Sequence, residues 1–167
     1  MGKIYEFDKI SSNYPRQSKI STKDLFKQKF RGTNQENNKD SCALRISIAF
    51  NESGIPIEKI GSVSGEYFWG NDKKLYILRA SGMKDYLWLK YGPPVIYTLK
   101  RILMAKELSP EAVKMWIKLK SSNGMMVVTR KTGRGSGHVD ILYKGMLFSG
   151  GALEKNWAHE VLFWEGI

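Results

Sequence analysis

Residues 40–54 read D-S-C-A-L-R-I-S-I-A-F-N-E-S-G, and the rest of the sequence is organised around this segment. Its apolar residues recur with helical spacing up to the closing glycine, which is a stop signal. Asp40 or Ser41 can cap the start. We therefore predict a helix over residues 41–53 that carries Cys42 in its first turn.

On either side of this helix, the sequence predicts mainly helices first and mainly strands later. Further helices are expected over 22–31, capped by Thr22, over 81–91, stopped by Gly92, and from Pro110 onward. Alternating or β-branched runs predict strands over 125–130, 138–144, 146–149 and 161–164. The expected fold class is α+β, with N-terminal helices packed on an antiparallel sheet.

The size and composition of the chain favour one domain spanning residues 1–167. Of its 167 residues, 42% are hydrophobic, which is enough to bury a core without covalent staples. No apolar run has the length of a signal peptide or a membrane span. The net charge of +11 should attract anionic polymers, and nucleic acid, anionic lipid and bacterial wall all qualify.

Cys42 is the only cysteine, so it forms no intramolecular disulfide, and a nucleophilic role is the alternative to a small buried hydrophobe. Unpaired N–H groups in the first turn of a helix stabilise negative charge and favour a thiolate. Ser41 precedes the thiol, and Arg45 lies three positions on, where its guanidinium can lower the thiol pKa if the side chain turns back. We assign both residues as candidate support for the thiolate or the oxyanion.

A nucleophilic cysteine needs a neighbouring base, and the chain has two histidines. His138 lies where a glycine-rich turn becomes an alternating strand, whereas His159 is assigned no role in catalysis by cysteine. Asp140 shares the strand face of His138, but two residues along a strand separate their Cβ atoms by roughly 7 Å. A residue on the neighbouring strand would orient the imidazole more directly, and Ser149 or a backbone carbonyl can fill that place.

Four segments of the chain together resemble a known family. They are F-D-K-I-S-S-N-Y-P (7–15), S-C-A-L-R-I-S-I-A-F-N-E-S-G-I-P-I (41–57), Y-I-L-R-A-S-G-M-K-D-Y-L (76–87) and S-G-H-V-D-I-L-Y-K-G (136–145). The strings Cys-Ala-x-Arg-x-Ser and Ser-Gly-His-x-Asp are fairly specific in combination. The chain resembles the fourth family of type VI secretion amidase effectors, which are papain-like cell-wall peptidases.

The resemblance implies a papain-like amidase fold and hydrolysis of the bond between the γ-carboxyl of D-glutamate and meso-diaminopimelate in peptidoglycan stem peptides. It matches Cys42 and His138 to the catalytic pair of the family. It also implies export by secretion-tube components without a signal peptide, action in the periplasm of a target bacterium and neutralisation by a cognate immunity protein. No cofactor, metal, nucleic acid or membrane insertion is expected.

The sequence departs from the family at the third catalytic residue. The family has an Asp about one strand and one turn after the histidine, and Ser149 stands near that place. Either Asp140 takes the orienting role, or Ser149 or a carbonyl does so. Loss of catalytic activity with retention of the fold is a further alternative.

Two other classes of function compete with cysteine catalysis. A zinc peptidase would use His138, Asp140 and His159, although the sequence lacks an H-E-x-x-H helix and this site would leave Cys42 without a role. A nucleic-acid-binding module would use the basic surface with exposed aromatic residues at 67–69, although no nucleic-acid-binding motif is present.

Overall fold

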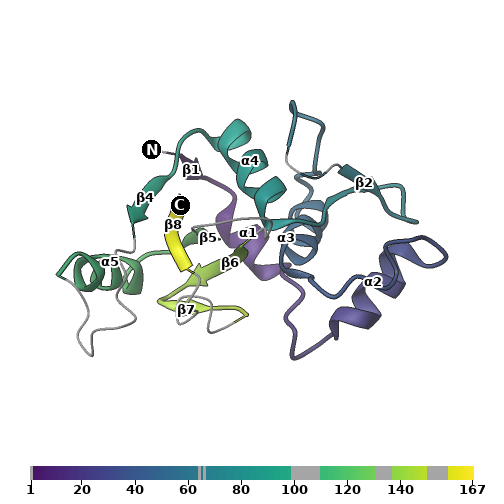
Figure 1. Ribbon diagram of the computed structural model, residues 1–167, viewed down its shortest axis with the longest axis horizontal. Helices are drawn as coiled ribbons and strands as arrows, with labels where there is room; N and C mark the ends of the chain where they lie inside the picture. The colour runs from purple at the N-terminus through teal and green to yellow at the C-terminus, as the bar shows by residue number, and fades with distance from the viewer. Residues whose placement is uncertain (1, 64, 66, 99–109, 131–136, 150–157) are drawn as a thin grey trace.

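The computed structural model describes the chain except for residues 1, 64, 66, 99–109, 131–136 and 150–157 (Figure 1). In chain order, the elements are β1 (Lys3–Ile4), α1 (Phe7–Ser12), α2 (Thr22–Phe30), α3 (Cys42–Glu52), β2 (Tyr67–Trp69), β3 (Leu75–Ile77), α4 (Ala80–Tyr91), β4 (Val95–Thr98), α5 (Pro110–Lys120), β5 (Gly124–Arg130), β6 (His138–Tyr143), β7 (Met146–Leu147) and β8 (Ala158–Gly166).

The main sheet is built around β8, which has partners along both of its edges. Its strand order is β1-β8-β5-β6-β7, and β4 also pairs with β8. All of these pairings are antiparallel except that of β1 with β8, which is parallel. The expected α+β class is therefore confirmed, and one short parallel edge makes the sheet mixed.

Helix α3 is the centre of the molecule, and it is buried on both sides. Apolar residues on one side pack with the sheet, including Ile46 against Val139 and Ile141 in one continuous core. Residues on the other side pack in a separate core with α2 and the β2–β3 hairpin, for example Leu44 with Phe26. Figure 1 shows α3 between these two layers. Every residue from Cys42 to Asn51 is buried, which explains the nearly continuous apolar sequence of this helix.

The structure confirms most of the predicted elements and corrects their ends. Ser21, not Thr22, is the N-cap of α2, because its hydroxyl accepts a hydrogen bond from the Asp24 backbone N–H. Gly92, with φ of 81°, ends α4 as expected. The prediction missed α1, β1, the β2–β3 hairpin and β4. The missed strands have two to four residues each, which is too short for alternation to stand out.

Candidate active site

Cys42 is the first residue of α3, and its thiol is buried. The side chain is only 6% exposed. Burial raises the pKa of the thiol, and the negative charge of Asp40 raises it further, while backbone N–H groups of Val139 and Ala43 lower it. Burial therefore opposes the expected effect of the helix N-terminus on the thiol pKa, because desolvation outweighs the backbone groups. In the resting protein Cys42 is a neutral thiol.

Asp40 occupies a backbone donor at the start of α3. The Cys42 backbone N–H donates to Asp40 Oδ1 at 3.3 Å. Ser41 holds the N-cap position, but its side chain makes no capping hydrogen bond to the helix. Asp40 is exposed, so an arriving substrate oxygen can displace its carboxylate from this N–H group.

Arg45 anchors the chain instead of turning back toward the thiol. It is 2% exposed, and its guanidinium donates to Ser41 Oγ at 3.0 Å, to the Ile20 carbonyl at 2.9 Å and to the Pro15 carbonyl. Ser41 Oγ also bonds to Thr22 Oγ1 at 2.9 Å. The hydrogen bonds of Ser41 and Arg45 thus tie the start of α3 to the N-terminal segment.

His138, Ser149 and Asp140 form one connected group. His138 Nε2 lies 2.8 Å from Ser149 Oγ and 3.8 Å from Asp140 Oδ2. Ser149 Oγ lies 2.7 Å from Asp140 Oδ2, and the Ser149 backbone N–H donates to both carboxylate oxygens at 3.2 and 3.1 Å. The Asp140 side chain is fully buried, and its Oδ1 also accepts from the Ile141 N–H at 2.8 Å. Both residues that the sequence offered for orienting His138 are therefore present in one series: Asp140 bonds to Ser149, and Ser149 bonds to His138.

This arrangement fixes the direction of the hydrogen bonds. An ionised Asp140 only accepts, so the single hydroxyl proton of Ser149 goes to Asp140 Oδ2. Ser149 Oγ must then accept from His138 Nε2, which carries the proton. The other ring nitrogen, Nδ1, is left without a proton, and it is the atom that can act as a base.

Cys42 contacts strand β6 at Val139, the residue after His138. Its sulfur accepts from the backbone N–H of Val139, which follows His138 in β6. No hydrogen bond joins the sulfur to the imidazole among the residues that the structure describes. Hydrogen bonds of this kind are often long in the free enzyme and shorten when substrate binds.

The competing sites gain little from the structure. The described residues contain no group of three His, Cys, Asp or Glu side chains placed to hold a metal ion. Of the aromatic residues at 67–69, only Trp69 is exposed; Phe68 packs against the core of α2, and the Tyr67 hydroxyl accepts from the Ile60 N–H. No helix in the described part of the chain is long and apolar enough to cross a membrane.

Residues 38–164 match the model of the family described as type VI secretion system amidase effector protein 4, Tae4. The chain belongs to this family. It is therefore an amidase effector of type VI secretion, as the sequence motifs predicted. No curated protein matches the chain by sequence.

Solved structures of Tae4 proteins share the fold over nearly the whole chain. The crystal structure of the effector Tae4 from Enterobacter cloacae has a TM-score of 0.72 at 16% identity and covers 99% of each chain. The effector–immunity system Tae4/Tai4 from Salmonella typhimurium has a TM-score of 0.65 at 19% identity and covers 100% of this chain and 99% of that one. The similarity confirms the expected fold at a low level of sequence identity.

Tyr14 is a site residue that the sequence prediction missed. It belongs to the same buried core as Cys42, and its hydroxyl lies in the electrostatic field of Asp140, Arg45 and Cys42. The only signal in the sequence was its place in the segment 7–15, which carried part of the family resemblance.

Proposed function

We propose that this effector hydrolyses the γ-D-glutamyl–meso-diaminopimelate bond of peptidoglycan stem peptides, with Cys42 as the nucleophile and His138 as the base. The observation that carries the proposal is the hydrogen-bonded series from Asp140 through Ser149 to His138. Among the described residues it leaves His138 Nδ1 as an acceptor without a hydrogen bond, and the N–H of the next residue, Val139, contacts the Cys42 sulfur.

In the first half of the reaction, His138 Nδ1 takes the thiol proton as the Cys42 sulfur attacks the carbonyl carbon. The carbonyl π electrons move to oxygen, and backbone N–H groups at the start of α3 stabilise the oxyanion once the substrate has displaced Asp40. The intermediate then collapses with cleavage of the C–N bond. The imidazolium gives its proton to the leaving amine, which departs from a thioester on Cys42.

In the second half, water attacks the thioester and His138 Nδ1 takes its proton. The C–S bond breaks, and the sulfur recovers a proton from the imidazolium. The γ-carboxyl group of D-glutamate leaves and loses its remaining proton to solvent as a carboxylate. Asp140 acts through Ser149, so that the imidazole keeps one orientation and the imidazolium lies near a buried carboxylate.

The position of the Asp140 carboxylate supports catalysis without an Asp at 149. Asp140 is the carboxylate of the group, and Ser149 transmits its effect to the imidazole. We propose that this exchange preserves catalysis and that the chain is not a degenerate amidase. Ser149 lies between His138 and Asp140, because its short side chain leaves room for the Asp140 carboxylate on the side away from the imidazole.

The same proposal includes the setting in which the enzyme works. The net charge of +11 favours residence on an anionic cell wall, and salt should weaken this effect. We propose that the protein passes through the secretion tube and acts in the periplasm of a target bacterium. A cognate immunity protein then protects the producing cell, since solved relatives are effector–immunity complexes.

The deciding experiment is digestion of diaminopimelate-type peptidoglycan by wild type, Cys42→Ala and Cys42→Ser, with the fragments identified by mass spectrometry. Wild type alone should yield fragments that end in D-glutamate, and both variants should fall by at least about 10³-fold. Equal cleavage by wild type and Cys42→Ala would exclude Cys42 as the nucleophile. Fragments from another bond would contradict the proposed substrate.

A further inference from the structure

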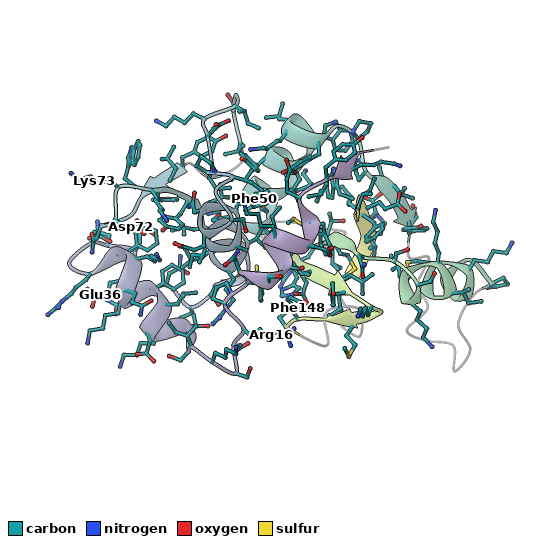
Figure 2. The ribbon with its side chains drawn as sticks, turned by 180° about the vertical axis from the view of Figure 1, so that it is seen from behind. Arg16, Glu36, Phe50, Asp72, Lys73 and Phe148 are labelled. Atoms are coloured by element: carbon teal, nitrogen blue, oxygen red, sulfur yellow. The ribbon has the colours of Figure 1, made fainter. Side chains whose placement is uncertain are left out.

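Tyr14 is held in a fixed position at the edge of the proposed site. It follows α1 directly, and its backbone N–H donates to the Ser11 carbonyl at 3.3 Å. Its ring packs against Phe148 with 5.4 Å between centroids, and Arg16 lies over the same Phe148 ring at 4.1 Å. Arg16 and Phe148 lie close together in Figure 2. Phe148 precedes Ser149, so the ring of Tyr14 is packed beside the residue that orients His138.

The Tyr14 hydroxyl is buried without a hydrogen-bond partner among the described residues. The side chain is 5% exposed. Buried hydroxyl groups in native proteins are bonded in the large majority of cases, and an exception calls for a reason. Three other hydroxyls in the described residues share this condition, those of Tyr91, Tyr97 and Thr129, but these residues are only partly buried. Among the described residues, Tyr14 is therefore the buried residue whose hydroxyl has no hydrogen-bond partner.

The charged neighbours of the Tyr14 hydroxyl narrow its role. They are Asp140, Arg45 and Cys42. Both Asp140 oxygens already accept two hydrogen bonds each, from Ile141 N–H and from Ser149. The Arg45 guanidinium has only donors and cannot accept. The remaining group is the Cys42 sulfur, which lies in the same buried core as Tyr14. Arg45 links the two segments, because it donates both to Ser41 Oγ, next to Cys42, and to the carbonyl of Pro15, next to Tyr14. Sulfur is a weak acceptor as a thiol and a strong one as a thiolate.

We propose that Tyr14 is a catalytic residue whose hydroxyl donates a hydrogen bond to the Cys42 thiolate that forms when His138 removes the thiol proton. The sulfur in the resting state accepts from the backbone N–H groups of Val139 and Ala43, and Tyr14 adds a third donor when the charge appears. The proposal rests on the proposed role of Cys42 as nucleophile. A hydrogen-bond donor that is already positioned in a low-dielectric site stabilises a charge that develops there during the reaction.

Tyr14 remains a donor throughout the cycle. Burial raises the pKa of its phenol, and the negative charge of Asp140 raises it further, while the Arg45 guanidinium lowers it. A thiolate at Cys42 adds a smaller increase when it forms. The hydroxyl therefore keeps its proton at any pH at which the enzyme works. The other charge that acts on the thiol is that of Asp40, which is unchanged by a substitution at position 14.

The test uses Tyr14→Phe, which removes the hydroxyl and keeps the ring against Phe148. The rate of Cys42 alkylation by iodoacetamide, measured against pH in the full-length protein, reports the thiol pKa without any peptidoglycan. We expect the profile to move to higher pH by about one unit, which is about a tenfold slower reaction at a fixed pH below the pKa. Cleavage of peptidoglycan should fall by a similar factor, mainly in kcat.

Tyr91→Phe is the matched control. The Tyr91 hydroxyl also lacks a hydrogen-bond partner among the described residues, but the groups that act on its pKa, besides burial, are Glu6 and Tyr86 and not Cys42. It should leave the alkylation profile unchanged. Thermal unfolding supplies a second measurement: Tyr14→Phe should unfold at the same or a higher temperature than wild type, because the lost hydroxyl had no partner in the resting protein.

Three outcomes would overturn the proposal. One is an unchanged alkylation profile in Tyr14→Phe. Another is a lower unfolding temperature, which would show that the hydroxyl has a structural partner. The third is an unchanged alkylation profile together with a shift of the acid limb of the pH–activity profile. That result would show that Tyr14 acts on Asp140 and His138 instead of on Cys42. Failure of the proposed amidase reaction is a separate result, because it appears in the Cys42→Ala digestion and leaves the alkylation data standing.

Discussion

Two groups of buried polar residues flank the first turn of α3, and they differ in how completely their hydrogen bonds are made. Arg45 and Ser41 on one side satisfy each other and the carbonyls of Pro15 and Ile20. In the other group, His138 has a ring nitrogen and Tyr14 a hydroxyl without a hydrogen-bond partner among the described residues. A closed network stabilises the fold, whereas an open one holds groups in place for a reaction.

The largest effect should follow from Asp140→Asn in the open group. The Asn carboxamide can donate to Ser149 Oγ, whose proton then turns toward His138 Nε2, and the imidazole proton moves to Nδ1. The base would be lost with little change of shape, so amidase activity should fall by about 10³-fold. Peptidoglycan digestion measures the rate, and NMR of the imidazole nitrogens reports the tautomer.

Ser149→Ala is the companion variant for this prediction. It removes the intermediate hydroxyl but leaves the Asp140 charge near the ring, at 3.8 Å from Nε2. Its loss of activity should be smaller, about tenfold. If Ser149→Ala lost more amidase activity than Asp140→Asn, the proposed order of action, from Asp140 through Ser149 to His138, would be contradicted.

A loss of stability without a direct catalytic effect is expected from Arg45→Met in the closed group. The substitution keeps the length of the apolar stem but leaves the Pro15 and Ile20 carbonyls and Ser41 Oγ without their donor. The free energy of unfolding should fall by about 3 kcal/mol, measured by urea denaturation. The exposed Arg31→Met is the control and should change stability by less than about 0.5 kcal/mol.

The kinetics of Arg45→Met separate the two groups further. At a temperature where the variant is folded, its alkylation profile should match that of wild type, because Arg45 is not among the groups that shift the pKa of the Cys42 thiol. A shift of the Cys42 pKa to higher values in this variant would restore the role of Arg45 in supporting the thiolate.

The smallest effect should come from Asp40→Asn. After burial, the charge of Asp40 is the next cause that raises the pKa of the Cys42 thiol. Its removal should lower that pKa, so alkylation by iodoacetamide at pH 7.5 should become about threefold faster. Asp8→Asn, at an exposed carboxylate of α1, should leave the rate unchanged. A slower reaction of Asp40→Asn would show that the hydrogen bond to the Cys42 N–H matters more than the charge.

The sequence predicted the fold where its signals are local. The helix over 41–53, the strand that begins at His138 and the start of α5 at Pro110 follow from periodicity, glycine placement and capping residues. The β2–β3 hairpin and β4 escaped because short strands owe their structure to partners that are distant in the sequence.

The site was predictable in its members but not in its connections. Cys42, His138, Asp140 and Ser149 followed from residue type, family motifs and strand alternation. The hydrogen bonds that connect Asp140 to His138 through Ser149 depend on the pairing of β6 with β7 and on the Ser149 N–H, which periodicity cannot reveal. Neither the burial of the thiol nor the position of Tyr14 is a property of a local segment, so both required the assembled core.

The place of β8 in the middle of the sheet sets the order of events during synthesis. Strand β5, which pairs with the β6 strand of His138, is itself paired along its length with residues 158–166. On the ribosome, these residues emerge after every other element of the sheet, and β1 at the other end of the chain must wait for them too. A growing chain therefore carries the Cys42 thiol for most of its translation before the sheet that contains His138 can be completed.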